Sequence, residues 1–445
     1  MSEVTVSTTG TDAGLVRAIG VRGLASNVVN NVVGSGIFVL PAVVAATLGA
    51  SAIIAYIICA FAIGLIGLSF AAVGSRVSKS GGTYAYAEEA FGPFVGFLTG
   101  ATFWLSQMVS AAAIATVLAG SVAALVPSLS SPIPRATLLI LVYVLMAGVN
   151  IRGVKAGVRV METLTIVKVV PLVLIVVAGA FFIRPVNLRW TSMPTFGAIS
   201  TACLLLVFTF TGVEGAVTTS GEVSNPSRTV PRAIILGLAG VSLLYVLVQL
   251  AAQGVLGPEL ALDQAAPLAS VADRMFGATG RTIIALAMIV SALGYISGDM
   301  LATPRLLFAF GRDGFLPARV GSVNQRYRTP VVAIVLYGAL TCGFALTGTF
   351  RSLVILATVT TLFVYAVTCL AAIELKRRNV VADGPPFQLA GGPVIPLLAC
   401  VVIAWMLTGA ERREFISVGA TLVVAAILYG IRAIFGTRPI SVSES

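Results

Sequence analysis

The chain alternates between long, almost uninterrupted apolar runs and short polar segments. Twelve of these runs are long enough to cross about 30 Å of hydrocarbon as helices. They cover 17–45, 50–75, 92–124, 135–152, 158–183, 196–221, 230–256, 280–308, 329–348, 352–376, 393–410 and 415–435. Because the runs are continuous and do not alternate in polarity, they predict helices and exclude a membrane β-barrel. The pattern therefore predicts an all-α integral membrane protein with twelve transmembrane helices.

Composition supports this class and explains the positive charge. Hydrophobic residues make up 58% of the chain and charged residues only 10%, against about 25% charged in a soluble domain. The net charge of +11 does not require a nucleic acid, because 19 of the 28 Lys and Arg residues fall in segments that are cytoplasmic when the N-terminus is inside. Basic residues concentrate on the cytoplasmic side of membrane proteins. A multi-pass protein of the plasma membrane with both termini in the cytoplasm is expected.

Cysteine and histidine usage gives no sign of a metal site. All five cysteines lie within apolar runs and none forms a CxxC pair, so they are expected to be buried small hydrophobes. Histidine, the usual metal ligand and proton shuttle, does not occur in the sequence. We expect neither a metal nor a cofactor.

Two of the runs are interrupted by glycine. The first contains "NNVVGSGIF" from Asn30 to Phe38, and the sixth contains "FTFTGVEG" from Phe208 to Gly215. Breaks in spans one and six predict two five-helix repeats of inverted orientation. The expected segments are a disordered cytoplasmic tail (1–15), the two repeats (16–185 and 195–377), helices 11 and 12 (392–436) and a second cytoplasmic tail (437–445).

A broken membrane helix leaves backbone groups that must line a cavity or meet a ligand. The amides of 34–36 would lie at the start of the outer half-helix, where the helix dipole favours a carboxylate. The carbonyls around 208–211 would end the other half-helix and suit an ammonium group. An α-amino acid carries both groups. The GSG sequence alone equally predicts a close helix crossing, and the second break favours the binding site.

Three ionisable residues lie deep within the runs: Lys168, Glu214 and Asp299. A charge at the bilayer centre costs at least about 2.5–3.5 kcal/mol, so it usually serves a function. One interpretation is a Lys–carboxylate pair that only joins helices, and the other is ion or proton coupling. Burial favours the neutral form of Glu214, which could then take and release a proton. Glu214 could also satisfy freed amides, and the Lys168 ammonium could occupy the place of a bound sodium ion.

Several motifs in order resemble the amino acid–polyamine–organocation superfamily of permeases, which share the leucine-transporter fold. They are "GSGIFVLP" (Gly34 to Pro41), "GGTYAYAEEAFGPFVGFLTGATFW" (Gly81 to Trp104), "FTFTGVEG", "GEVSNPSRTVP" (Gly221 to Pro231) and "ATPRLLFAFGRDGFLP" (Ala302 to Pro317). The resemblance covers roughly 15–435. It implies alternating access, in which spans one, two, six and seven rock against spans three, four, eight and nine.

The resemblance, together with the breaks, gives a set of expected site residues. The coupling positions are Lys168, Glu214 and Tyr295, of which Lys168 matches a lysine that replaces sodium in sodium-independent members. Phe208 matches an aromatic gate, and Gln107 is expected to face the site from the third span. The expected substrate-binding residues are Asn31, Gly34, Ser35, Gly36, Gln107, Phe208, Thr209, Phe210, Thr211, Gly212 and Asp299.

The sequence departs from this family at three positions. Phe208 stands where arginine exchangers carry tryptophan, Tyr295 where many relatives carry a small hydroxyl residue, and Asp299 where relatives mostly carry an uncharged residue. Asp299 would face either a cationic substrate in the cavity or Lys168. We expect a sodium-independent, proton-coupled or exchanging transporter of a small or medium neutral amino acid. The alternative is a cationic amino acid or polyamine exchanger that uses Asp299.

Other classes fit less well. A membrane-embedded enzyme would need a nucleophile–base constellation, and a channel would need a continuous polar lining rather than two breaks. A phosphate-binding loop is not evident in the sequence, so the chain itself is not expected to use ATP. The expected partners are an amino acid, protons and the lipid bilayer. Nucleic acid is not expected, and the protein would be a monomer or a loose homodimer.

Overall fold

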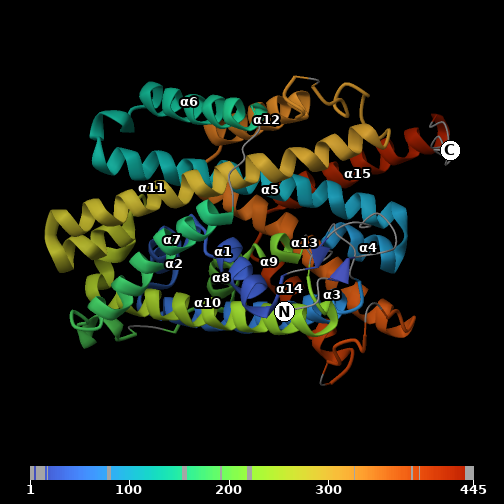
Figure 1. Cartoon of the computed structure of the whole chain (residues 1–445). Coiled ribbons are helices and arrows are strands. Elements are labelled where there is room, and N and C mark those ends of the chain that lie inside the picture. The colour runs from blue at the N-terminus through green and yellow to red at the C-terminus, as the bar shows by residue number, and fades with distance from the viewer. Residues whose placement is uncertain are drawn as a thin grey trace.

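The computed structural model describes residues 5–6, 16–17, 19–77, 82–152, 158–190, 193–217, 223–324, 326–381, 384–389 and 391–435, with backbone only for 5–6, 16–17, 158–167, 216 and 435. Long helices dominate it (Figure 1). The α-helices are α1 (Val21–Val32), α2 (Leu40–Leu48), α3 (Ala52–Gly74), α4 (Thr83–Phe91), α5 (Pro93–Leu125), α6 (Pro132–Ile151), α7 (Val158–Gly179), α8 (Phe196–Phe210), α9 (Val213–Ala216), α10 (Pro226–Leu256), α11 (Pro267–Arg312), α12 (Val331–Thr347), α13 (Phe350–Arg377), α14 (Val394–Leu407) and α15 (Arg412–Phe435).

Short elements connect these helices. The 3-10 helices are η2 (Ser35–Phe38), η3 (Gly49–Ser51), η4 (Pro127–Ser130), η5 (Pro185–Leu188) and η7 (Gly257–Ala261). Two-residue strands, β1 (Thr5–Val6) and β2 (Val16–Arg17), pair antiparallel near the N-terminus. The rest of the predicted tail 1–15 and the predicted tail 437–445 lie outside the described residues.

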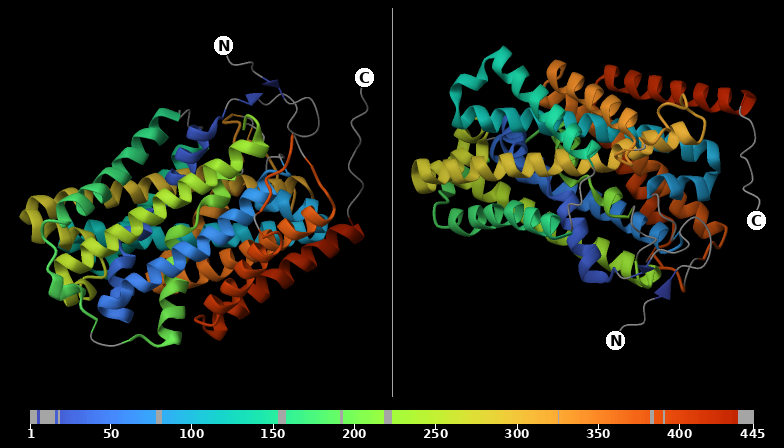
Figure 2. Two further views of the ribbon diagram at one scale, coloured as in Figure 1. Left: turned by 90° about the horizontal axis from the view of Figure 1, so that it is seen from below. Right: turned by 45° about the horizontal axis from the view of Figure 1, so that its top comes forward.

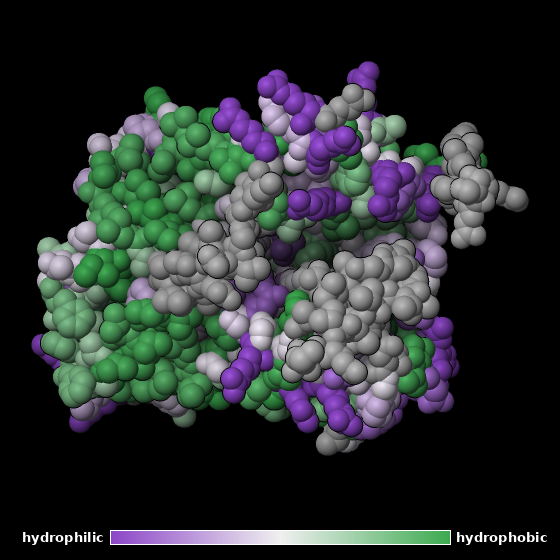
Figure 3. Space-filling model, in the orientation of Figure 1, coloured by the Kyte–Doolittle hydropathy of each residue, from purple (hydrophilic) through white to green (hydrophobic). Residues whose placement is uncertain are grey.

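The multi-pass membrane class is confirmed. Eight helical segments of the described chain are long and apolar enough to cross a membrane, and three shorter apolar helices accompany them. Each of the twelve predicted runs overlaps one helix or one helix pair, while the count of twelve crossings and the inverted repeat remain predictions. Figure 3 shows hydrophobic side chains over the left of this face and hydrophilic ones gathered toward the right.

The helices form two packed groups with α13 between them. In the first group α10 packs along α1 and α3, and α3 packs against α8. In the second group α5 and α6 pack against α11 and α12. Figure 1 shows α10 along one edge of the molecule and α6 with α12 along the opposite edge, and Figure 2 shows the bundle of long helices from two further sides. These groups correspond to the spans expected to move against each other.

Two segments between the predicted spans also contain helix. Segment 76–92 contains α4. Segment 257–279 contains η7 and the start of α11. Helix α11 is interrupted at Gly277, which has a φ of 67°. Segment 257–279 is therefore more helical than its polar sequence suggests.

The five cysteines are free thiols, and two of them are less buried than expected. Cys59, Cys203 and Cys369 are buried, whereas Cys342 and Cys400 are only partly buried. The last two lie on α12 and α14, where Val335 and Val401 are 51% and 64% exposed. Apolar runs do not distinguish helices inside the bundle from helices at its periphery, because lipid accepts the same side chains.

Candidate substrate and coupling site

Both predicted helix breaks are present. Helix α1 ends at Val32, and Val33 and Gly34 separate it from η2 and the second half-helix, α2. Helix α8 ends at Phe210, after which Gly212 has a φ of 127° before α9 begins. The amide of Gly34 donates to the Val32 carbonyl at 2.8 Å. Of the three amides expected at the carboxylate position, one therefore has a partner within the chain.

The two breaks lie directly against each other. A Cβ atom on Gly212 would lie 2.4 Å from the Asn31 carbonyl oxygen, and a Cβ atom on Gly36 would lie 3.1 Å from the Phe208 ring. Glycine is required at 212 because the backbone of the first break approaches it, and at 36 because the Phe208 ring and the Thr209 methyl group leave little room for a side chain. The two breaks, which are far apart in the sequence, thus form a single junction in the folded protein.

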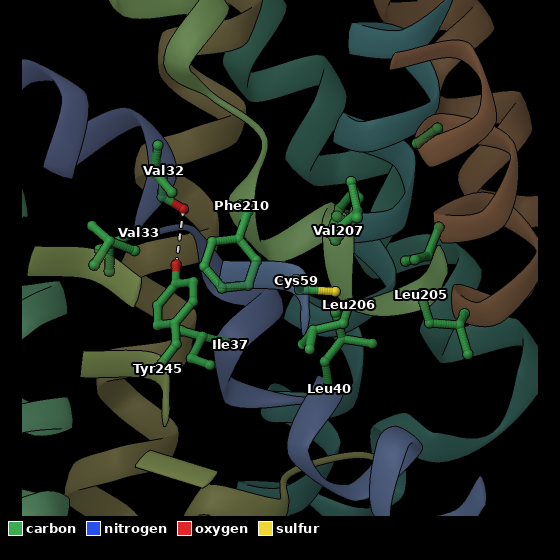
Figure 4. Close-up of a cluster of buried hydrophobic side chains, with 14 of the residues drawn as sticks. Val32, Val33, Ile37, Leu40, Cys59, Leu205, Leu206, Val207, Phe210 and Tyr245 are labelled. Carbon is green, nitrogen blue, oxygen red and sulfur yellow. Dashed lines mark hydrogen bonds between the residues drawn. The ribbon is translucent and has the colours of Figure 1, made fainter. Parts of the chain in front are cut away.

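Tyr245 on α10 joins the two breaks from the side. Its hydroxyl group donates to the Val32 carbonyl at 3.0 Å and to the Thr209 carbonyl at 3.1 Å. Figure 4 shows the tyrosine pointing to Val32 among buried apolar side chains. The sequence analysis missed Tyr245. The sequence feature that indicates this role is a tyrosine within an apolar run, because a buried tyrosine hydroxyl group usually finds a hydrogen-bond partner.

Loss of this hydroxyl is expected to loosen the junction. Changing Tyr245→Phe removes the donor of the buried Thr209 carbonyl, while the Val32 carbonyl keeps the Gly34 amide, at a cost of about 1–3 kcal/mol. We expect a lower melting temperature of the purified protein and slower substrate uptake. Tyr143→Phe on α6, which removes a donor to the Ala111 carbonyl, is the matched control. If both variants reduce uptake equally, the junction has no special dependence on Tyr245.

Glu214 satisfies the broken backbone and links it to α13. The side chain is 3% exposed, and its Oε2 accepts from the Gly212 amide at 2.9 Å and from the Tyr365 hydroxyl at 2.6 Å. A carboxylate inside a bundle needs such donors to offset its desolvation. A proton arriving at Glu214 would weaken both hydrogen bonds, so its charge state bears directly on the geometry of the second break.

Lys168 contacts the first break rather than a carboxylate. Its side chain is 5% exposed, and Nζ donates to Asn30 Oδ1 at 3.4 Å, which links α7 to α1. Within the described residues, Lys168 forms no ion pair with Glu214 or Asp299. The interpretation of a helix-joining Lys–carboxylate pair therefore has no support in this geometry.

Asp299 lies within the second helix group. Its side chain is 8% exposed, and its two oxygens accept from the hydroxyl groups of Thr303 at 2.6 Å and Tyr337 at 2.5 Å. The second bond connects α11 to α12. Both oxygens thus have donors from the scaffold, and the structure does not pair the carboxylate with Lys168. Tyr295, one turn earlier on α11, is partly buried.

The other predicted site residues differ in whether their polar groups already have hydrogen-bond partners. The Phe208 carbonyl accepts from the Thr211 hydroxyl at 2.8 Å, so this carbonyl and that of Thr209 already have donors. The hydroxyl of Ser35 is fully buried and has no partner among the described residues. Gln107 is partly buried on α5, and Phe210 is buried. Asn31 donates to the Asn27 side chain at 2.7 Å.

Phe208 also links the junction to a cavity through Phe350. It is 5% exposed and meets Phe350 edge-to-face, with ring centroids 6.4 Å apart. Phe350 in turn lines a cavity of about 270 Å³, together with Val39, Thr116 and Arg135. The aromatic pair thus lies between Gly36, which contacts Phe208, and residues of this cavity. Phe350 was missed by the sequence analysis, because nothing in its local pattern indicates contact with the sixth span.

This geometry can now be compared with known proteins. A sequence model of the amino acid permease family matches residues 19–431, nearly the whole chain. The chain belongs to the amino acid permease family. The resemblance to the amino acid–polyamine–organocation superfamily is therefore confirmed, and the protein is a membrane transporter of this family.

Similar transporters cover almost the full length of the chain. The serine/threonine exchanger SteT of Bacillus subtilis is 28% identical over 440 residues, covering 96% of this chain and 98% of its own. The branched-chain amino acid permease BcaP of the same organism is 24% identical, with 95% and 94% covered. An uncharacterized transporter of Mycobacterium tuberculosis is 29% identical over 411 residues. These relatives support an amino acid transporter without specifying the substrate.

Proposed function

We propose that the protein is a secondary active transporter that moves amino acids across the cytoplasmic membrane by alternating access. The observation that carries this proposal is the junction of the two broken helices, where Gly212 lies against the backbone of Asn31 and Gly36 lies against the side chains of Phe208 and Thr209. Broken helices that meet at mid-membrane are the usual substrate site of such transporters. The two packed helix groups supply the bodies that would move, with both termini in the cytoplasm.

The substrate would be a small or medium neutral amino acid. Its carboxylate would meet the amides of Ser35 and Gly36, and the partnerless Ser35 hydroxyl supplies a further donor. Its ammonium would meet carbonyls at the end of α8, which requires Tyr245 or Thr211 to release one of them. SteT and BcaP, named for neutral amino acids, support this class.

A cationic amino acid or polyamine remains the alternative substrate. It would need Asp299 as a counter-charge, yet both carboxylate oxygens already accept hydrogen bonds from Thr303 and Tyr337. A cation would have to share these oxygens with both donors. The neutral substrate is favoured because it needs no counter-charge from Asp299.

Thermal unfolding of the purified protein with a panel of amino acids and amines tests the substrate class. A ligand that binds only the folded state raises the melting temperature, by about 2.7 kcal/mol of stability at a concentration one hundred times its Kd. We expect small neutral amino acids to stabilise the protein and arginine or diamines to leave it unchanged. Stabilisation by the cations alone would replace the neutral assignment by the alternative.

Coupling is proposed to use protons or exchange, without sodium. Lys168 supplies a fixed positive group beside the first break, and Glu214 is the acid attached to the second. Changing Glu214→Gln keeps a side-chain oxygen for the Gly212 amide and removes the titrating group. We expect uptake by this variant in proteoliposomes to lose its dependence on pH, while exchange between internal and external substrate continues.

Two controls separate coupling from folding in that experiment. Glu374→Gln changes a partly exposed carboxylate paired with Arg377 and should leave the pH profile unchanged. Replacing external sodium by potassium should leave uptake unchanged in the wild type. A pH profile of Glu214→Gln identical to the wild type would remove Glu214 from the coupling mechanism, whatever the substrate.

A further inference from the structure

A separate cavity lies at the end of α10 away from the moving interface. It has a volume of about 200 Å³ and is enclosed by the end of α10, by η3 with the start of α3, and by η5. Ile53, Leu188 and Trp190 contribute its apolar surface, and Gln249 and Gln253 are its polar residues. None of the residues that line it belongs to the junction of the broken helices.

Gln249 is buried in this cavity without a hydrogen-bond partner. Its side chain is 0% exposed, and neither the amide oxygen nor the amide nitrogen has a partner among the described residues. The Oε1 atom of Gln253, which is 4% exposed, is also without a partner there. An unpaired buried amide costs about 1–3 kcal/mol, so such groups in native proteins are normally met by water or a ligand.

The wall of the cavity is anchored, so the space is a built feature of the fold. The Asn187 side chain on η5 donates to the Gly254 carbonyl at 2.9 Å, and the Arg184 amide donates to the same carbonyl at 3.0 Å. The Nε2 atom of Gln253 donates to the Asn187 carbonyl at 3.4 Å. These bonds attach η5 to the end of α10 and keep it from closing onto Gln249.

The cavity is connected to the junction through α10. Tyr245, Gln249 and Gln253 follow each other at intervals of four residues and so share one face of the helix. Gln249 lies four residues, about 6 Å along the axis, from the tyrosine that bridges both breaks. The cavity is therefore lined by the same face of α10 that holds the junction together.

We propose that this cavity is a second binding site, for a small uncharged molecule that both donates and accepts hydrogen bonds. The Gln249 amide offers two donors and one acceptor, and Gln253 adds an acceptor. Its lining residues in the described chain are uncharged, which disfavours ions and zwitterions. Water is the smallest molecule with this chemistry, and the volume admits several waters or one primary amide.

The stability of Gln249→Leu distinguishes an occupied cavity from a dry one. If the cavity is occupied, the leucine removes the partner of the bound molecule and the melting temperature of the purified transporter falls by several degrees. If the cavity is dry, the leucine removes two buried polar atoms that have no hydrogen-bond partner, and the melting temperature rises. Val248→Ala, a neighbour on another face of α10, measures the ordinary cost of a change in packing. A rise for Gln249→Leu would overturn the proposal.

Cysteine labelling gives a second, independent measurement. Ile53→Cys should react with a small water-soluble thiol reagent several-fold faster than Val248→Cys, which is buried outside the cavity; the wild type corrects for the native cysteines. Slower labelling in the presence of acetamide identifies an amide-type ligand, and unchanged labelling identifies water as the occupant. Equal rates for Ile53→Cys and Val248→Cys would contradict the proposal even if substrate transport proceeds as described above.

Discussion

Replacing Gly212 by alanine is expected to abolish transport and to destabilise the folded protein. The added Cβ would lie 2.4 Å from the Asn31 carbonyl oxygen, and the residue has a φ of 127°, which L-amino acids rarely adopt. The backbone strain and the overpacking together cost on the order of 2–6 kcal/mol. The two breaks would have to move apart, and Glu214 would lose its bond to the Gly212 amide.

Gly215→Ala is the matched control for this change. A Cβ there would lie 3.4 Å from the Asn31 side-chain oxygen, an ordinary contact distance, and the residue belongs to α9. We expect this variant to insert, unfold and transport nearly as the wild type does. Uptake and thermal unfolding of both variants in the same lipid give the comparison. If Gly212→Ala transports normally, the close contact of the breaks is not needed for the transport cycle.

The second large effect is expected for Gly36→Val. A Cβ at Gly36 would lie 3.1 Å from the Phe208 ring and 3.3 Å from the Thr209 methyl group, and valine adds two further methyl groups. Overpacking of this kind costs about 1–3 kcal/mol. The variant should still insert into the membrane, but Phe208 would be displaced and the proposed carboxylate position would be covered. Loss of substrate-induced thermal stabilisation, with retained expression, is the expected result.

A second substitution, on the Phe208 side of this contact, separates the effect of Gly36→Val on stability from its effect on substrate binding. Phe208→Ala removes the ring that valine would strike, so Gly36→Val with Phe208→Ala should unfold at a higher temperature than Gly36→Val alone. Substrate binding should stay lost in the double variant, because the valine still covers the amides. Recovery of binding together with stability would show that Gly36 serves close packing and not the carboxylate.

Much of the fold was predictable from local pattern. The runs that became α3, α5 and α10 are continuous apolar segments, and hydrocarbon tolerates only structures that satisfy their own backbone. The breaks in spans one and six followed from glycines within such runs, and the structure has both. The burial of Lys168, Glu214 and Asp299 followed from their depth in the spans.

The partners of these charges could not be predicted. Glu214 meets Tyr365, which lies far along the chain on α13, and Asp299 meets Tyr337 on α12. The sequence analysis placed Asp299 opposite either a substrate or Lys168, because it considered charges and not tyrosines. In an apolar run, nothing local distinguishes a tyrosine that faces lipid from one that donates to a buried carboxylate.

The sequence by itself determined that this protein is a multi-pass membrane protein with two broken helices and three buried charges. These properties depend on hydrophobic length and on helix-breaking glycines, which act locally. Only the tertiary structure decided that the breaks form one junction, that Tyr245 joins them, and that Glu214 completes the broken backbone. Such contacts depend on the relative rotation and depth of helices packed across the bundle, which side chains distant in the sequence determine together.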